Sequence, residues 1–208
     1  MHTRPESPAR FARPGTLQGT GVLLEPLAPE HREPLRRAAK VDESIWTYFP
    51  INYNGAGDDF DSWFDYTMAK FAGEEHYPFA VIRRSDGDVV GTTRFYDLVP
   101  DHKRLAIGST WYRNDVRGTR IHPEVRLLTL TYAFDRLAVN RVELITDPQN
   151  LVSRAAMKIL GAVEEGLIRQ HMIYKDGRIR DSLLFSIIRS EWPRVRERLL
   201  KAMDFSPV

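Results

Sequence analysis

The stretch from Trp111 to Leu137, WYRNDVRGTRIHPEVRLLTLTYAFDRL, most constrains what this chain can fold into. It predicts the end of a strand, a short polar loop holding Gly118, and a helix that begins at His122-Pro123-Glu124. The N–H groups of a first helical turn lack intrahelical partners and the helix dipole adds positive charge, so such a junction is a generic anion site. Full positive charges flank the loop at Arg113, Arg117 and Arg120. The stretch therefore predicts a phosphate-bearing ligand.

Hydrophobic periodicity and turn signals predict the elements around this stretch. Alternation of apolar and polar residues predicts strands at 20–27, 77–84, 89–98, 104–113, 141–146, 162–174 and 181–189. Helical spacing predicts helices at 29–41, 58–72, 123–137, 147–160 and 192–203, the fourth ended by Gly161. Asp86-Gly87 and Asp176-Gly177 are hairpin signals, because Gly supplies the positive φ that such turns require.

This order of elements predicts one α/β domain, residues 16–208, with a mixed central β-sheet flanked by helices. The lone strand 141–146 lies between two helices, so it is expected to run parallel to the strand before the polar loop. A ligand at the carboxyl end of a strand is the usual arrangement in such a sheet. Residues 1–15 are rich in Pro and Arg without an apolar core, and are predicted to form a flexible N-terminal arm.

Composition excludes several classes of protein. The chain has 208 residues, a formal charge of +2 and no cysteine, so disulfides, thiolate metal sites and a Cys nucleophile are excluded. No apolar run reaches the ~18 residues that span a bilayer, and the absence of cysteine fits a reducing cytoplasm, the expected location. Lys and Arg are interspersed with acids rather than gathered on one stripe, which argues against a nucleic-acid partner.

Four segments together resemble the GNAT family of acetyl-CoA-dependent N-acetyltransferases, and most closely the branch that acetylates the N-termini of ribosomal proteins. They are the loop VRGTRIHPE, the strand–helix segment VELITDPQNLVSRAAMKILGA, the hairpin GLIRQHMIYKDGRIRDSLLFSII and the closing EWP. The resemblance covers about Thr16 to Leu200. It implies a single GNAT-like domain with a splayed strand pair at the coenzyme A site, and a homodimer as the common assembly of the family.

The resemblance also implies acetyl-CoA as cosubstrate and no metal. The pyrophosphate would lie on backbone N–H groups of the loop, and the pantetheine would pair with the strand end at Thr110 to Arg113. Asn150 would hydrogen-bond the pantetheine and Ser153 would lie near the thioester sulfur. The alternative, which the resemblance makes the weaker one, is that both residues merely cap the helix. The implied cofactor-binding residues are Trp111, Tyr112, Arg113, Arg117, Gly118, Thr119, Arg120, Ile121, His122, Asn150 and Ser153.

The chain departs from the family pattern at three positions. Arg120 stands where the loop usually carries a second Gly or Ala, and Asp115 stands where a Gln or Arg is usual. Many family members have a Tyr general acid at the position of Met157, which cannot donate a proton. The ribosomal-protein branch is understood to use a Ser hydroxyl, and Ser153 is the match.

Acetyl transfer to an amine also needs a base and an oxyanion donor. Asp97 and His171 are the candidate bases and Glu143 is a poorer one; the alternatives are a turn residue for Asp97 and a structural or surface role for His171. A backbone N–H near Tyr112 is the candidate oxyanion donor. The candidates for lining the acceptor cleft are Trp46, Tyr48, Arg94 and Tyr96, of which Trp46 and Tyr48 are equally plausible as core residues.

Three functions follow, in decreasing order of support. The first is an N-acetyltransferase that moves acetyl from acetyl-CoA to a primary amine, either a protein N-terminus or a small amine. The second is a GNAT-like module that binds coenzyme A without turnover, favoured by Met157 and Arg120. The third is a nucleic-acid or ribosome-associated adaptor, which rests only on the basic arm and the Arg-rich loop.

Overall fold

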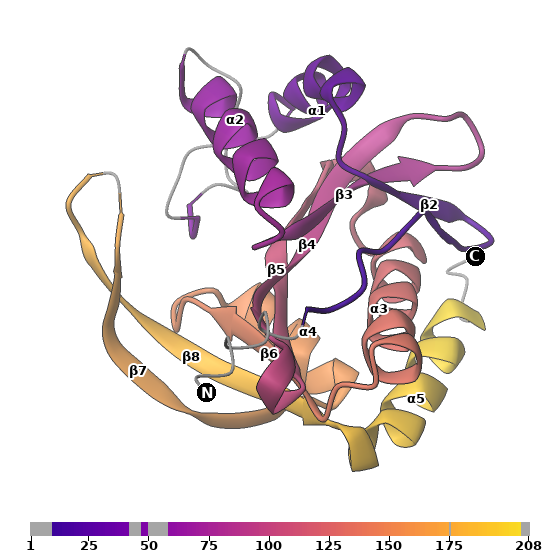
Figure 1. Ribbon diagram of the computed structural model, residues 1–208, viewed down its shortest axis with the longest axis vertical. Coiled ribbons are helices and arrows are strands. Elements are labelled where there is room, and N and C mark those ends of the chain that lie inside the picture. The colour runs from indigo at the N-terminus through magenta and orange to yellow at the C-terminus, as the bar shows by residue number, and fades with distance from the viewer. Residues whose placement is uncertain (1–9, 42–46, 50–57, 175, 205–208) are drawn as a thin grey trace, which may run out of the picture.

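The computed structural model describes residues 10–41, 47–49, 58–174 and 176–204, and these form one mixed sheet with helices on both faces (Figure 1). The eight strands are ordered β1-β2-β3-β4-β5-β6-β8-β7. Their bounds are Leu17–Gln18 (β1), Val22–Pro26 (β2), Tyr77–Arg83 (β3), Val89–Val99 (β4), Arg104–Tyr112 (β5), Arg141–Thr146 (β6), Val163–Ile173 (β7) and Ile179–Ile188 (β8). The predicted α/β class with a mixed sheet is confirmed.

The helices are α1 Arg32–Ala39, α2 Asp58–Ala72, α3 Ile121–Thr131, α4 Leu151–Leu160 and α5 Trp192–Asp204. A π-helical turn, Tyr132–Arg136, extends α3. Short 3-10 turns are formed by Pro29–His31, Pro100–His102, Asn114–Val116 and Arg189–Glu191. The predicted helix 58–72 and strand 141–146 have the expected bounds.

Other bounds differ from prediction for local reasons. The predicted strand 20–27 is shorter, 22–26 (β2), because the residues before it form the turn that joins β2 to β1, where Gly19 donates its N–H to the Val22 carbonyl at 2.9 Å. The helix expected at 147–160 begins only at Leu151, because Asp147 accepts the Gln149 N–H at 2.8 Å and holds a turn before the cap. Gly161 ends this helix with a φ of 93°, a conformation that a Cβ disfavours.

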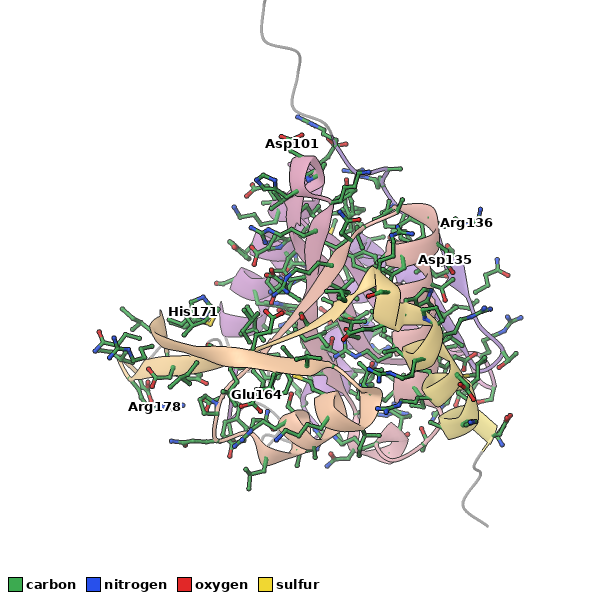
Figure 2. The ribbon with its side chains drawn as sticks, turned by 90° about the horizontal axis from the view of Figure 1, so that it is seen from below. Asp101, Asp135, Arg136, Glu164, His171 and Arg178 are labelled. Carbon is green, nitrogen blue, oxygen red and sulfur yellow. The ribbon has the colours of Figure 1, made fainter. Side chains whose placement is uncertain are left out.

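Two apolar cores lie on the two faces of the sheet. The larger joins the α3 and α5 side chains Val125, Leu130, Val195 and Leu199 to Phe95 of β4 and Phe185 of β8. The smaller joins α1 and α2 to Ala80 and Trp111, with the predicted core aromatics Phe60, Trp63 and Phe64 buried in it. Figure 1 shows α1 and α2 on one side of β3 to β5, and α3 and α5 on the other. The β7–β8 hairpin extends away from both layers and carries His171 and Arg178, far from Asp135 and Arg136 near the helices (Figure 2).

The described part of the N-terminal segment contacts the domain. Tyr77 donates its hydroxyl to the Phe11 carbonyl at 2.8 Å, and Arg13 donates to the Phe71 carbonyl at 2.8 Å. Residues 1–9 lie outside the described residues, so the flexible arm at 1–15 stays a prediction.

Candidate functional site

The strands β5 and β6 part from one another beside the polar loop. They run parallel, as predicted, but pair only at Arg104–Arg141, Leu105–Val142 and Ala106–Glu143. Beyond this point β5 continues to Tyr112 while β6 stays paired with β8 through Thr146. The inner edge of β5 therefore carries backbone groups that no strand satisfies. We call the space between the two strands the β5–β6 opening.

The backbone of Tyr112 faces this opening. Arg113 donates its N–H to the Val90 carbonyl of β4 at 2.8 Å. Because residues of an antiparallel strand alternate in the direction of their hydrogen-bonding groups, the N–H and C=O of Tyr112 are turned away from β4. A register shift between Thr92 and Arg94 places a bulge in β5 at Ser109, whose φ is 47°. This edge can pair with an extended, amide-containing ligand.

The polar loop leads from β5 into α3 at the open end. Gly118 has a φ of 71°, which favours Gly. Thr119 accepts the Ile121 N–H at 3.3 Å and Pro123 has no N–H, so the first turn of α3 offers the N–H of His122. A cavity of about 620 Å³ adjoins the loop and is lined by residues 20–21, 83–85, 115–116 and 119–121. The sequence prediction included the loop but missed Arg83 and Arg84, since β3 is far away in sequence.

Charges beside the loop are paired with one another. Arg113 donates from Nε to Asp115 Oδ1 at 2.7 Å, and Arg83 donates from Nη1 to Asp115 Oδ2 at 3.0 Å. Hydrogen bonding from Arg113 is the main reason that the pKa of Asp115 falls to about 2. Arg113 also contacts Asp88 at 3.2 Å. The acid that departs from the family pattern is thus held within a cluster containing two arginines.

The side chain of His122 turns inward, below the opening. Its ring centroid lies 5.6 Å from that of Tyr112, and its Nε2 accepts from Arg126 Nε at 3.3 Å. Burial, followed by the charge of Arg126, lowers the pKa of His122 to about 3, so the imidazole is neutral near pH 7. The Tyr112 hydroxyl and Arg126 Nη1 are buried without a hydrogen-bond partner in the described chain.

Asn150 and Ser153 lie at the start of α4, after β6. Asn150 Oδ1 accepts the Ser153 N–H at 3.0 Å, so Asn150 is the N-cap of α4. This arrangement leaves the Asn150 amide nitrogen and the Ser153 hydroxyl for other partners. Met157, one turn further along α4, is buried.

Arg94 and Tyr96 lie on the α2 face of the sheet. Thr92 is directly opposite Trp111, which packs against α1 and α2, and alternate residues of β4 share this face. Arg94 donates from Nη2 to Ser109 Oγ in the bulge. The Tyr96 ring lies 6.2 Å from that of His76, whose pKa falls to about 4 through burial and the charge of Arg94. Trp111 itself is core, and by the same alternation its backbone groups face β4, so the predicted contact of Trp111 with a ligand has no free group in the structure.

Asp97 lies at the closed end of the opening. Its φ is 48°, and burial, then the charge of Glu143, raises the pKa of its carboxyl. The charge of Arg104 opposes this shift, and His171 and Arg94 are close enough to Asp97 to oppose it as well, so the fold brings both candidate bases into one electrostatic neighbourhood. Glu143 is held by Arg141 at 2.8 Å, which leaves it less available as a base.

A buried polar cluster on β6 and the β7–β8 hairpin was missed by the sequence prediction. Tyr174 donates its hydroxyl to Asp147 Oδ2 at 2.8 Å, and the Tyr48 carbonyl lies 3.1 Å from the same hydroxyl. Arg180 Nε is 3.9 Å from Asp147 Oδ2, and both side chains are almost fully buried. The sequence signals are the position of Asp147 directly after a strand and the neighbouring Arg180 and Asp181 of the hairpin; in the structure Asp181 Oδ1 accepts the Gln170 N–H at 2.7 Å. Tyr48, a predicted acceptor-cleft residue, is thereby tied to the hairpin, whereas Trp46 lies outside the described residues.

The described residues show neither a metal-binding group nor a membrane-spanning helix. Within them, no group of three or more His, Cys, Asp or Glu side chains has a metal-binding arrangement. Among the helices of the same residues, none is long and apolar enough to cross a membrane.

The chain is similar to known proteins in both sequence and structure. The model of the acetyltransferase (GNAT) domain matches residues 22–163. A Bacillus subtilis protein provisionally named ribosomal N-acetyltransferase YdaF is 30% identical over 107 residues, which are 51% of this chain and 57% of YdaF. The chain spans between 55% and 63% of the lengths of the curated relatives it matches.

Solved structures extend the similarity over most of the chain. A GCN5-related N-acetyltransferase from Brucella melitensis has a TM-score of 0.84 and 29% identity, covering 92% of this chain and 87% of its own. Mycobacterium smegmatis RimJ, solved in complex with CoA-disulfide, has a TM-score of 0.74 and 24% identity, covering 94% and 95%. At this level of identity, the likeness to RimJ shows a shared fold alone.

Proposed function

The chain belongs to the GNAT acetyltransferase family, and from this premise we propose that it transfers acetyl from acetyl-CoA to a primary amine. The observation that carries the proposal is the parting of β5 and β6 next to the polar loop. An extended ligand with amides can pair with the free edge of β5, and an anion can lie at the loop before α3. Coenzyme A has both features in one molecule.

In this proposal the pyrophosphate lies on the loop at residues 117–122 and the pantetheine pairs with the backbone of Tyr112. Arg117 and Arg120 provide positive charge at the loop, where they flank Gly118 and Thr119. Asn150 donates its amide N–H to the pantetheine while its oxygen caps α4. The rest of the loop contributes to coenzyme A binding through its backbone groups and its shape, at Gly118, Thr119, Ile121 and His122.

The chemistry is a direct attack. The amine nitrogen forms a bond with the thioester carbonyl carbon, the C–S bond breaks, and the thiolate takes a proton through the Ser153 hydroxyl, which regains a proton from solvent water. The amine loses a proton to Asp97 or His171, directly or through water. The raised pKa of Asp97 makes its carboxylate a better proton acceptor than an ordinary Asp.

The acceptor class is a protein N-terminus or a small amine. The name of YdaF favours a ribosomal protein. Candidate contacts for the acceptor are Arg94, Tyr96 and Tyr48, with Trp46 proposed from sequence alone. A cytoplasmic location and a homodimer complete the proposal, and light scattering of the purified chain tests the dimer.

A second candidate is a coenzyme A-binding module without turnover. It is favoured by Met157, which occupies the usual position of the Tyr general acid and is buried. In this case the loop and the β5 edge would retain their ligand, but no acceptor would be acetylated.

Calorimetric titration with acetyl-CoA, followed by thiol release over a panel of amines and peptide N-termini, separates the candidates. Binding with thiol release supports the enzyme, and binding without release on every acceptor supports the module. Absence of binding overturns both. A matched pair of variants tests where acetyl-CoA binds. Arg120→Ala should weaken binding of acetyl-CoA. Arg136→Ala should not, because Arg136 is exposed in the π-helical turn that follows α3.

A further inference from the structure

Tyr96 lies where the β5–β6 opening closes. It is directly opposite Ala106 across the β4–β5 ladder, and Ala106 is the last residue of β5 that pairs with β6. An extended ligand that enters from the loop would end near this point. Tyr96 therefore lies at the reacting end of the proposed coenzyme A site rather than at its phosphate end.

The phenol of Tyr96 crosses the strand at Gly108. A Cβ at Gly108 would lie 2.9 Å from Tyr96 Cε1 and 3.2 Å from its hydroxyl oxygen, so the ring needs a glycine here. Gly108 directly precedes the bulged Ser109, where the regular pairing of β4 and β5 is interrupted. The Tyr96 hydroxyl therefore lies against the backbone of Gly108, next to the bulge.

Neighbouring side chains hold the ring in place. His76 packs edge-on at 6.2 Å between ring centroids, and the Arg94 guanidinium carbon lies 6.0 Å from the Tyr96 ring centroid. Arg94 is itself fixed by its hydrogen bond to Ser109 Oγ. Within the described residues the Tyr96 hydroxyl has no hydrogen-bond partner, so its proton is available to a ligand.

We propose that the Tyr96 hydroxyl donates a hydrogen bond to the thioester carbonyl oxygen of acetyl-CoA and stabilises the oxyanion that forms during transfer. This inference rests on the proposed function. No proton leaves Tyr96: the amine adds to the carbonyl carbon, the oxyanion is held by the phenol, and the C–S bond then breaks. A preorganised donor of this kind acts mainly on the transition state.

The acidity of Tyr96 fits a donor better than an acid. Burial, then the charge of Asp97, raises the pKa of Tyr96 to about 12. A phenol whose pKa is raised by burial keeps its proton while it donates a hydrogen bond. Tyr96 remains protonated at neutral pH and complements Ser153, the proposed acid, rather than replacing it.

The test is the carbonyl stretch of carbonyl-¹³C acetyl-CoA, measured by isotope-edited infrared difference spectroscopy on the bound cosubstrate. We expect a lower frequency in the wild type than in free acetyl-CoA, and loss of this downshift in Tyr96→Phe. Tyr132→Phe is the matched control, because Tyr132 stacks on Phe95 from the opposite face of the sheet. Gly108→Ala, which displaces the phenol without removing it, should also lose the downshift.

Binding and turnover distinguish this inference from the proposed function. Tyr96→Phe should bind free coenzyme A like the wild type, because the thiol has no carbonyl. Its kcat should fall by about 10²–10³, the usual cost of removing one oxyanion donor, with little change in KM for acetyl-CoA. An unchanged downshift in Tyr96→Phe would overturn the role of Tyr96 alone. No binding of acetyl-CoA to the wild type would overturn the proposed function and this inference together.

Discussion

Arg113 Nε lies 2.7 Å from Asp115 Oδ1, so the acid beside the proposed phosphate site is neutralised by the residue that directly follows β5. Arg83, on β3, completes the pairing from the other side at 3.0 Å. An isolated carboxylate here would repel a phosphate. The observed cluster instead fixes the loop that leads into α3.

Asp115→Asn should destabilise the fold slightly and in a pH-dependent way. The folded-state pKa of Asp115 is lowered to about 2, so its stabilisation is present above the unfolded value of about 3.8 and is lost as the pH falls toward 2. Its side chain is 45% exposed, so solvent screening limits the effect to at most about 1 kcal/mol.

Urea unfolding of the wild type and Asp115→Asn between pH 7 and 2.5 measures this contribution. The two stability curves should be separated by a constant difference above pH 5 and should converge below pH 4. A difference that persists unchanged at pH 2.5 would contradict the assignment of the shift to ionised Asp115.

Glu124→Gln should destabilise the β1–β2 hairpin and the adjoining cavity wall. The buried carboxylate accepts the Gly21 N–H at 3.0 Å and the Thr20 hydroxyl at 3.0 Å. A Gln side chain keeps one oxygen that can accept a hydrogen bond. Its NH₂ group takes the place of the other oxygen and faces donors with which it cannot bond. Losing a buried hydrogen bond of this kind costs about 1–3 kcal/mol. Thermal unfolding measures the loss, with the exposed Glu30→Gln as a control that should be near neutral.

Tyr174→Phe should affect the acceptor more than acetyl-CoA. The variant removes the hydroxyl that reaches both Asp147 Oδ2 and the Tyr48 carbonyl, and leaves the buried Asp147 with one donor fewer. We expect a loss of about 1–3 kcal/mol in the free energy of unfolding. Steady-state kinetics should show a higher KM for the acceptor and an unchanged KM for acetyl-CoA. An effect confined to acetyl-CoA would contradict a role on the acceptor side.

Ser153→Ala should reduce turnover without unfolding α4. The cap of this helix uses the Ser153 backbone N–H, which the variant keeps, so its melting temperature should be close to that of the wild type. If the hydroxyl protonates the thiolate, kcat for thiol release should fall by about 10²-fold or more. Turnover equal to that of the wild type would remove Ser153 as the acid.

Sequence patterns alone predicted most of the elements, because period, turn chemistry and helix ends are local. The hairpin at Asp86-Gly87 and the end of α4 at Gly161 follow from the need for a positive φ. The parallel pairing of β5 and β6 follows from chain order, since a helix connects them. The GNAT fold was recognisable at this level.

The tertiary structure decided which side chains meet. Arg83 reaches Asp115 across 32 residues, Tyr174 reaches Asp147 across 27, and Tyr96 crosses Gly108 only because of the β4–β5 register. Register and side-chain direction depend on pairing between distant strands, which no local pattern encodes. The sequence by itself determined the fold and the family, whereas packing decided which charges are neutralised and that the Tyr96 phenol lies over Gly108.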